Sequence, residues 1–275
     1  MTQSAIITST FVGAQPRIAI DVAGTTGHLV VFVHGIGGNR QNWTAQLTAL
    51  GTHYRAVALD IRGYGASEDY AGPMLLDDIC ADIVRVIEHF SVARATLVGL
   101  SMGGMIAQEF YRRFSGHVQS LILCSTNAGI GVDLSPAQKR EFVAMRNGPL
   151  LEGGEPADLI PAMRAVLFGE APSAAALAGL EQSVGALRKA SYMKAIEAMV
   201  EFDSSDLHER IDVPTLLISG SHDKVIPPAH MQAMYRTIPG AELTVLEGAG
   251  HLLNLEQPDA FNRALRNFLS RHVAA

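Results

Sequence analysis

The chain has 275 residues, 48% of them hydrophobic, and carries a formal net charge of −6. A chain of this length can bury a large core, which favours one α/β domain that carries an insertion. The basic residues are scattered and no apolar stretch approaches about 18 residues, so neither nucleic acid nor a membrane is expected as a partner.

Apolar, strand-like runs alternate with amphipathic helical runs along most of the chain. Strands are expected near residues 5–12, 17–22, 29–34, 54–59, 95–100, 119–124, 214–219 and 241–246. Helices are expected near residues 42–50, 76–90, 102–114, 227–238 and 258–271. This alternation predicts a mainly parallel eight-stranded sheet with helices on both faces, and the early, polar-edged strands are expected to pair antiparallel.

The strand predicted at residues 29–34 runs into a glycine-rich segment, HGIGG at residues 34–38. Glycine-rich loops expose backbone N–H groups, which can stabilise a developing oxyanion. We therefore expect the N–H group of Ile36 to be one of two oxyanion donors. Gly35 in this loop and Trp43 on the next helix are expected to contact the substrate.

The most informative motif is GLSMG at residues 99–103, which joins the strand predicted at 95–100 to the helix that follows it. A serine between two glycines on such a turn is typical of a nucleophile elbow, because the tight turn leaves no room for side chains. Ser101 is therefore the candidate nucleophile. Met102 begins the next helix, where the helix dipole adds positive potential, so its N–H group is the second expected oxyanion donor.

The alternation of strands and helices stops between about residues 128 and 205. This stretch is rich in alanine, leucine and methionine, and it is punctuated by Gly148-Pro149 and Gly153-Gly154. It predicts a helical cap, residues 128–205, inserted into a core formed by residues 1–127 and 206–275.

An apolar cap with flexible methionines suits a hydrophobic acyl or aryl group. The residues expected to bind substrate there are Met145, Met163 and Met193. Further candidates for the pocket wall, each of which could instead pack inside the cap, are Phe168, Leu187, Tyr192, Ile196 and Met199. A substrate that carries a carboxylate would instead need a cation in the pocket, and the candidates are Arg146, Arg164 and Arg188.

An acid and a histidine follow the last two predicted strands. Asp223 follows the strand at 214–219, and His251 follows the strand at 241–246. The carboxyl ends of parallel strands share the edge of the sheet where ligands bind. We therefore expect His251 to act as the base and Asp223 to orient it, as in a Ser-His-Asp triad. The next candidate for the acid is Asp133.

The sequence shows no pattern that indicates a metal site, a cofactor or a disulfide. Metal-binding sequences such as His-Glu-x-x-His are absent, and a serine triad needs no cofactor, so none is expected. Cys80 and Cys124 are expected to be buried free thiols in a reducing cytoplasm.

The N-terminal residues lack the pattern of a secretory signal, so a cytoplasmic location is expected. A homo-oligomer is left open.

Five motifs in this order resemble the α/β-hydrolase fold superfamily over nearly the whole chain. They lie at residues 34–38, 60–67, 99–104, 220–223 and 248–251. Within that superfamily the chain most resembles serine esterases and the 3-oxoadipate enol-lactonase group. Ser101 stands where haloalkane dehalogenases and epoxide hydrolases carry aspartate, which disfavours those activities. Leu252 stands where related carbon–carbon bond hydrolases often carry tryptophan.

The expected activity is hydrolysis of a small-molecule carboxylic ester or lactone through an acyl-enzyme. Three other chemistries on the same triad stay open: an enol-lactonase of aromatic catabolism, a carbon–carbon bond hydrolase and a cofactor-free perhydrolase. A ligand-binding receptor on the same fold is the alternative that is not an enzyme, and the presence of all three triad residues argues against it.

Overall fold

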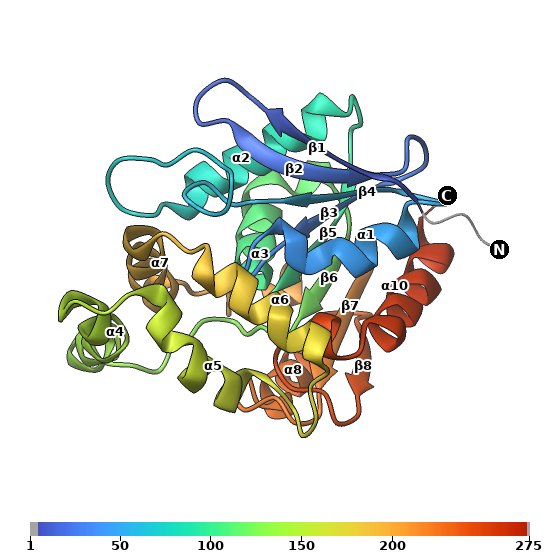
Figure 1. Ribbon diagram of the computed structural model, residues 1–275. Helices are drawn as coiled ribbons and strands as arrows, with labels where there is room; N and C mark the ends of the chain where they lie inside the picture. Colours follow the sequence, from blue (N-terminus) through green and yellow to red (C-terminus); the bar gives the residue numbers. More distant parts are fainter. Residues whose placement is uncertain (1–4, 274–275) are drawn as a thin grey trace.

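The computed structural model describes residues 5–273. Eight strands form one sheet in the order β1-β2-β4-β3-β5-β6-β7-β8 (Figure 1). The strands are β1 (Ile7–Val12), β2 (Ile18–Ala23), β3 (Leu29–Val33), β4 (Arg55–Leu59), β5 (Ala95–Leu100), β6 (Val118–Cys124), β7 (Thr215–Gly220) and β8 (Glu242–Leu246). Each predicted strand is present, with ends that differ by at most two residues.

Strand direction agrees with the prediction. β1 and β2 pair antiparallel, and β2 also pairs antiparallel with β4, whereas the five pairings from β4 to β8 are parallel. In the β3–β5 ladder Val33 lies opposite Gly99. This register brings the loop after β3 beside the turn after β5.

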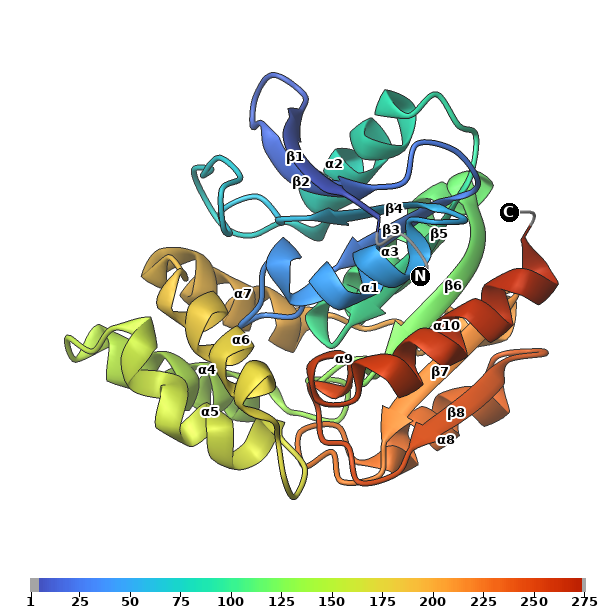
Figure 2. The same cartoon turned by 45° about the vertical axis from the view of Figure 1, so that its right-hand side comes forward.

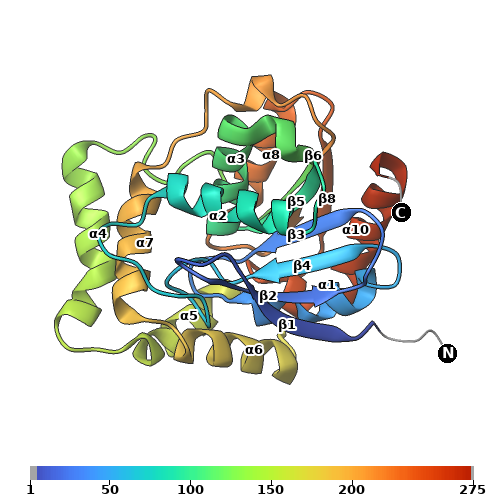
Figure 3. The ribbon, with the colours of Figure 1, turned by 90° about the horizontal axis from the view of Figure 1, so that it is seen from above.

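Helices cover both faces of the sheet, as the view from above shows (Figure 3). The core helices are α1 (Thr44–Leu50), α2 (Leu76–His89), α3 (Met102–Phe114), α8 (Pro228–Thr237), α9 (Leu253–Glu256) and α10 (Pro258–His272). Residues of α2, α3 and α8 pack with Val31 and Val33 on one face, and residues of α1 and α10 pack with Val30 and Phe32 on the other. Alternate residues of one strand thus serve two cores, because strand side chains point to opposite faces.

Four further helices lie between β6 and β7 in the chain. These cap helices are α4 (Pro136–Leu151), α5 (Ile160–Leu167), α6 (Ala174–Gly185) and α7 (Lys189–Glu201). They gather at one end of the sheet (Figures 1 and 2). Ser135 begins α4 with a capping box to Gln138, and the helix continues through Pro149. The Gly148-Pro149 pair thus lies in the last turn of α4, which ends at Leu151, and Gly153-Gly154 follows that end.

Cys80 in α2 and Cys124 at the end of β6 are buried and form no disulfide, as predicted. Within residues 5–273 no helix combines the length and the apolarity needed to cross a lipid bilayer.

Candidate active site

Ser101 sits on a strained turn between β5 and α3. Its backbone angles are φ 55° and ψ −118°, in a region that residues other than glycine rarely adopt. The turn is held by its neighbours: the Ser101 N–H group donates to Cys124 O at 2.9 Å, and Thr126 Oγ1 donates to Ser101 O at 2.8 Å. The side chain is thereby presented at the edge of the sheet rather than in the core.

The two glycines of the motif are required sterically. A Cβ atom on Gly99 would lie 2.2 Å from Gly103 O, and one on Gly103 would lie 2.1 Å from Val33 O. Both distances are far below van der Waals contact and both involve backbone atoms, which cannot easily move. The structure thus gives the physical reason for the spacing that the sequence analysis used.

His251 and Asp223 meet across two loops. His251 Nδ1 lies 2.9 Å from Asp223 Oδ2, and both residues are 3% exposed. Asp223 Oδ1 accepts from the N–H groups of Val225 and Ile226 at 2.9 and 2.8 Å. Burial alone would raise the pKa of Asp223, but the hydrogen bond and charge of His251, with the Ile226 N–H group, lower it below its usual value. An ionised carboxylate therefore faces His251 Nδ1, which must carry a proton.

The loop after β3 is fixed by His34. Ile61 N–H donates to His34 Nε2 at 3.1 Å, so the ring proton is on Nδ1, which donates to Gly35 O at 2.8 Å. Gly38 N–H donates to the same oxygen at 3.0 Å. Because the peptide is planar, fixing Gly35 O also fixes the direction of the Ile36 N–H bond. Burial lowers the pKa of His34, so the ring is neutral.

The two N–H groups expected to form an oxyanion hole come from neighbouring segments. Ile36 lies in the loop after β3 and borders the same pocket as Ser101. Met102 is the first residue of α3 and is 1% exposed. Among residues 5–273 neither N–H group has a hydrogen-bond acceptor. Both are thus available to a ligand.

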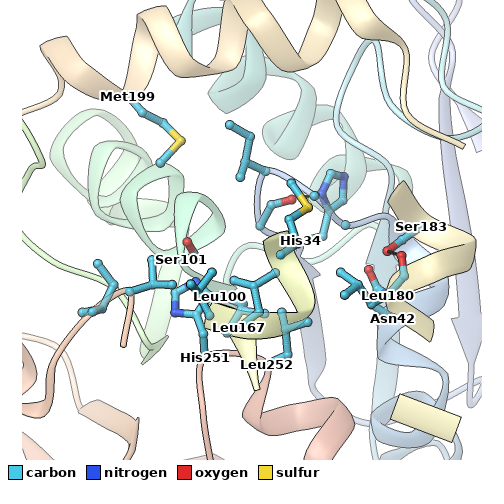
Figure 4. A pocket seen from close by; sticks show the side chains of 18 of the residues that line it. His34, Asn42, Leu100, Ser101, Leu167, Leu180, Ser183, Met199, His251 and Leu252 are labelled. Carbon is cyan, nitrogen blue, oxygen red and sulfur yellow. Dashed lines mark hydrogen bonds between the residues drawn. The ribbon is translucent and has the colours of Figure 1, made fainter. Parts of the chain in front are cut away.

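A cavity of about 320 Å³ lies between the sheet and the cap helices (Figure 4). Ser101 and His251 both border it, but no hydrogen bond joins their side chains within the described part of the chain. Such bonds often tighten only when a substrate binds. The wall is mainly apolar, and the cap helices supply Met163, Val166, Leu167, Leu180, Tyr192, Ile196 and Met199.

The five residues expected to bind substrate divide into two groups. Gly35, Trp43 and Met163 line the cavity. Met145 and Met193 do not: Met145 is 62% exposed on α4, and Met193 packs against the cluster formed by Leu150, Tyr192 and Ile196. The periodicity of a cap helix shows that it has an apolar face, but not which element covers that face.

The three arginines considered as anion binders lie in different surroundings. Arg146 borders the cavity, with its guanidinium 5.4 Å from the centre of the Phe142 ring. Arg164 pairs with Glu181 at 3.4 Å, and Arg188 donates to the backbone oxygens of Ser67 and Gly65.

Other polar side chains of the cavity were not predicted from the sequence. Lys224, directly after Asp223, borders it and donates to Ala165 O at 3.2 Å. Its position beside the expected acid was a signal that could have identified it. Asn42, Ser183 and Asn254 also line the cavity, and no local sequence pattern marks them. Across residues 5–273, His, Cys, Asp and Glu side chains form no group of three or more that could hold a metal ion.

A family model described as the alpha/beta hydrolase fold matches residues 28–258, so the chain belongs to that family. Among curated proteins it is similar to 3-oxoadipate enol-lactonase 2 of Acinetobacter baylyi, with 28% identity over 244 residues and 88% of each chain covered. It is also similar to a solved thermophilic esterase from Thermogutta terrifontis, with a TM-score of 0.85, 29% identity, and 98% of this chain and 100% of that chain covered. The solved enol-lactonase from Burkholderia xenovorans has a TM-score of 0.84 and 27% identity, with 96% of this chain and 100% of that chain covered.

Proposed function

We propose that the protein is a serine hydrolase that cleaves carboxylic ester or lactone bonds of small molecules. The observation that carries this proposal is the shared cavity: Ser101, on its strained turn, borders the same space as His251, whose ring is hydrogen-bonded to Asp223. A nucleophile that borders a cavity, an oriented base and a nearby pair of N–H groups are the requirements of acyl transfer.

The reaction proceeds in two halves. His251 takes the proton of Ser101 Oγ as that oxygen attacks the carbonyl carbon, and the Ile36 and Met102 N–H groups stabilise the tetrahedral oxyanion. His251 then gives its proton to the leaving alcohol oxygen, which leaves an acyl group on Ser101. Water, deprotonated by the same ring, attacks that acyl carbon, and the ring then returns this proton to Ser101 Oγ as the acid leaves. Asp223 stabilises the imidazolium in both halves.

The cavity favours a small and mainly neutral substrate. Its volume of about 320 Å³ is at the lower end of the range for ligand pockets, roughly 300–1,000 Å³. Methionines at 163 and 199 border it and can adapt to differently shaped acyl or aryl groups. The similarity to a solved esterase supports this first candidate.

A second candidate substrate is a lactone that carries a carboxylate. Arg146 and Lys224 both border the cavity, and neither forms an ion pair with a carboxylate within residues 5–273. Two cations that no carboxylate of the described residues neutralises, beside an apolar space, can bind an anionic end group while the lactone ring lies deeper. Similarity to two enol-lactonases supports this candidate as well.

The first experiment replaces the nucleophile. Ser101→Ala should lower kcat for p-nitrophenyl acetate by about 10⁴-fold or more, while substrate binding persists, because only the attacking atom is lost. Ser270→Ala, on the exposed face of α10, is the control and should turn over normally. Turnover at the wild-type rate in a clean Ser101→Ala preparation would overturn the proposal. A single turnover by the wild-type protein would favour a ligand-binding receptor.

A further inference from the structure

The loop that carries His251 is bonded to the cap helices through its backbone. Leu167, the last residue of α5, accepts from His251 N–H at 2.8 Å and from Leu252 N–H at 3.2 Å. All three residues border the cavity (Figure 4). The end of a cap helix therefore supplies the backbone acceptor for His251 itself.

No side chain separates the two segments. A Cβ atom on Gly250 would lie 2.5 Å from Gly169 N, and one on Gly169 would lie 2.0 Å from Gly248 O. The linker from α5 to α6 and the loop before His251 thus pack backbone against backbone. Any shift of the linker is transmitted directly to the residue before the histidine.

One carboxylate joins these two segments. Glu256, the last residue of α9, accepts from Gly250 N–H through Oε1 and from Gly169 N–H through Oε2, each at 2.8 Å. Burial raises the pKa of Glu256, and the nearby Asp223 carboxylate acts in the same direction, whereas the two N–H groups oppose them. A half-buried carboxylate beside a second carboxylate is unfavourable by itself, so its two backbone bonds account for its position.

We propose that Glu256 is a positioning residue that couples the cap helices to His251. Its two oxygens hold the residue before the histidine and the α5–α6 linker at a fixed distance, and Leu167 O completes the link. The inference rests on the proposed function, in which His251 is the base. A base displaced by about 1 Å can lose roughly 10²-fold in rate, so the coupling acts on the chemical step more than on binding.

The kinetic test compares Glu256→Gln and Glu256→Ala with the wild type. Glutamine keeps one acceptor but turns an NH₂ group toward the other N–H group, so kcat should fall about 10-fold, and about 100-fold in the alanine variant. KM should stay within about twofold, because the wall of the cavity is unchanged. Glu247→Gln is the matched control: it removes the same charge from an exposed residue near the same loop and should keep the wild-type kcat.

A folded Glu256→Ala variant with kcat within twofold of the wild type would overturn the inference. Equal losses in Glu247→Gln would overturn it too, because charge alone would then explain the effect. Ser101→Ala separates the two proposals: if it is inactive while Glu256→Ala is fully active, only the coupling fails. If both variants are fully active, the proposed function fails with it.

Amide hydrogen exchange in the wild-type protein gives a result even where the variants do not fold. The N–H groups of Gly169 and Gly250 should both be protected and should have one common protection factor, since one carboxylate holds both. Exchange of Gly169 at the rate of an unprotected amide, beside a protected Gly250, would show that the link is absent and would overturn the inference.

Discussion

At the scale of single residues, the clearest relation is between Asp223 and the tautomer of His251. The carboxylate accepts from Nδ1, so in the neutral ring the proton is on Nδ1, and Nε2 is the nitrogen that can take one from the serine. An amide at this position can donate to Nδ1 instead, and would then stabilise the wrong tautomer.

Asp223→Asn should therefore fold normally and lower kcat by about 10²–10⁴-fold, because the ring proton would move to Nε2. Circular dichroism checks the fold and steady-state kinetics the rate. Near-normal kcat would mean that another acid orients the base. Asp133, the alternative from the sequence, is exposed and does not border the cavity, so its replacement should leave kcat unchanged.

His34 gives a prediction on pH and stability. Its folded-state pKa is lowered by burial, so below about pH 6.5 the unfolded chain takes up a proton that the folded ring resists. The stability present above that pH is lost as the pH falls toward the lower folded-state pKa. Urea unfolding at pH 7.5 and 5.5 should show this loss in the wild type.

The same measurement on His34→Ala separates two effects. At pH 7.5 the free energy of unfolding of the variant should be about 1–3 kcal/mol lower than that of the wild type, because the buried Ile61 N–H group loses its acceptor. At pH 5.5 the difference in free energy of unfolding between wild type and variant should be smaller, because only the wild type carries the His34 ring. A constant difference would contradict the assignment of a neutral buried ring.

At the scale of elements, the turn between β5 and α3 limits which residues can flank Ser101. Gly103→Ala places a methyl group against Val33 O, a backbone atom of β3, and should lower the free energy of unfolding by about 3 kcal/mol. Gly116→Ala is the control, since a Cβ atom there meets nothing within 4 Å. Urea unfolding compares the two, and equal stabilities would contradict the close approach of β3 and α3.

The strands were predictable because the pattern that defines them is local. Runs such as Leu29–Val33 and Ala95–Leu100 are apolar throughout, as expected of parallel strands buried on both faces. Ser101, Asp223 and His251 were identifiable because each follows a strand end. The wall of the cavity was predictable only in part. Tyr192, Ile196 and Met199 border the cavity as expected, but Met145 and Met163 look alike in sequence and differ only in what packs on them. The short helix α9 and the role of Glu256 depend on contacts between distant segments.

At the scale of the whole molecule, the cavity combines an apolar interior with two cations, and substrate series can distinguish their effects. Each buried methylene group contributes at most about 0.8 kcal/mol, so two added to a neutral acyl chain should raise kcat/KM by up to about tenfold until the cavity is full. We expect kcat/KM to be higher for neutral esters with aryl or short acyl groups than for anionic lactones. Rates across p-nitrophenyl esters of increasing acyl length test this.

Arg146→Gln tests the anionic candidate. If an anionic enol-lactone is preferred by about a hundredfold, and this variant abolishes the preference while sparing neutral esters, the lactonase candidate replaces the esterase. Arg164→Gln is the matched control, because Arg164 already pairs with Glu181 away from the cavity.

The cap helices occupy one unbroken stretch of chain, between β6 and β7, yet they form much of the cavity wall. The expected nucleophile, base and acid all lie outside that stretch. A single exchange of the intervening segment could thus give an evolving lineage a new substrate range with its chemistry intact. The link to His251 sets a limit on such exchanges. Any replacement segment must place a backbone carbonyl at the position of Leu167, and a glycine with a free N–H group at the position of Gly169.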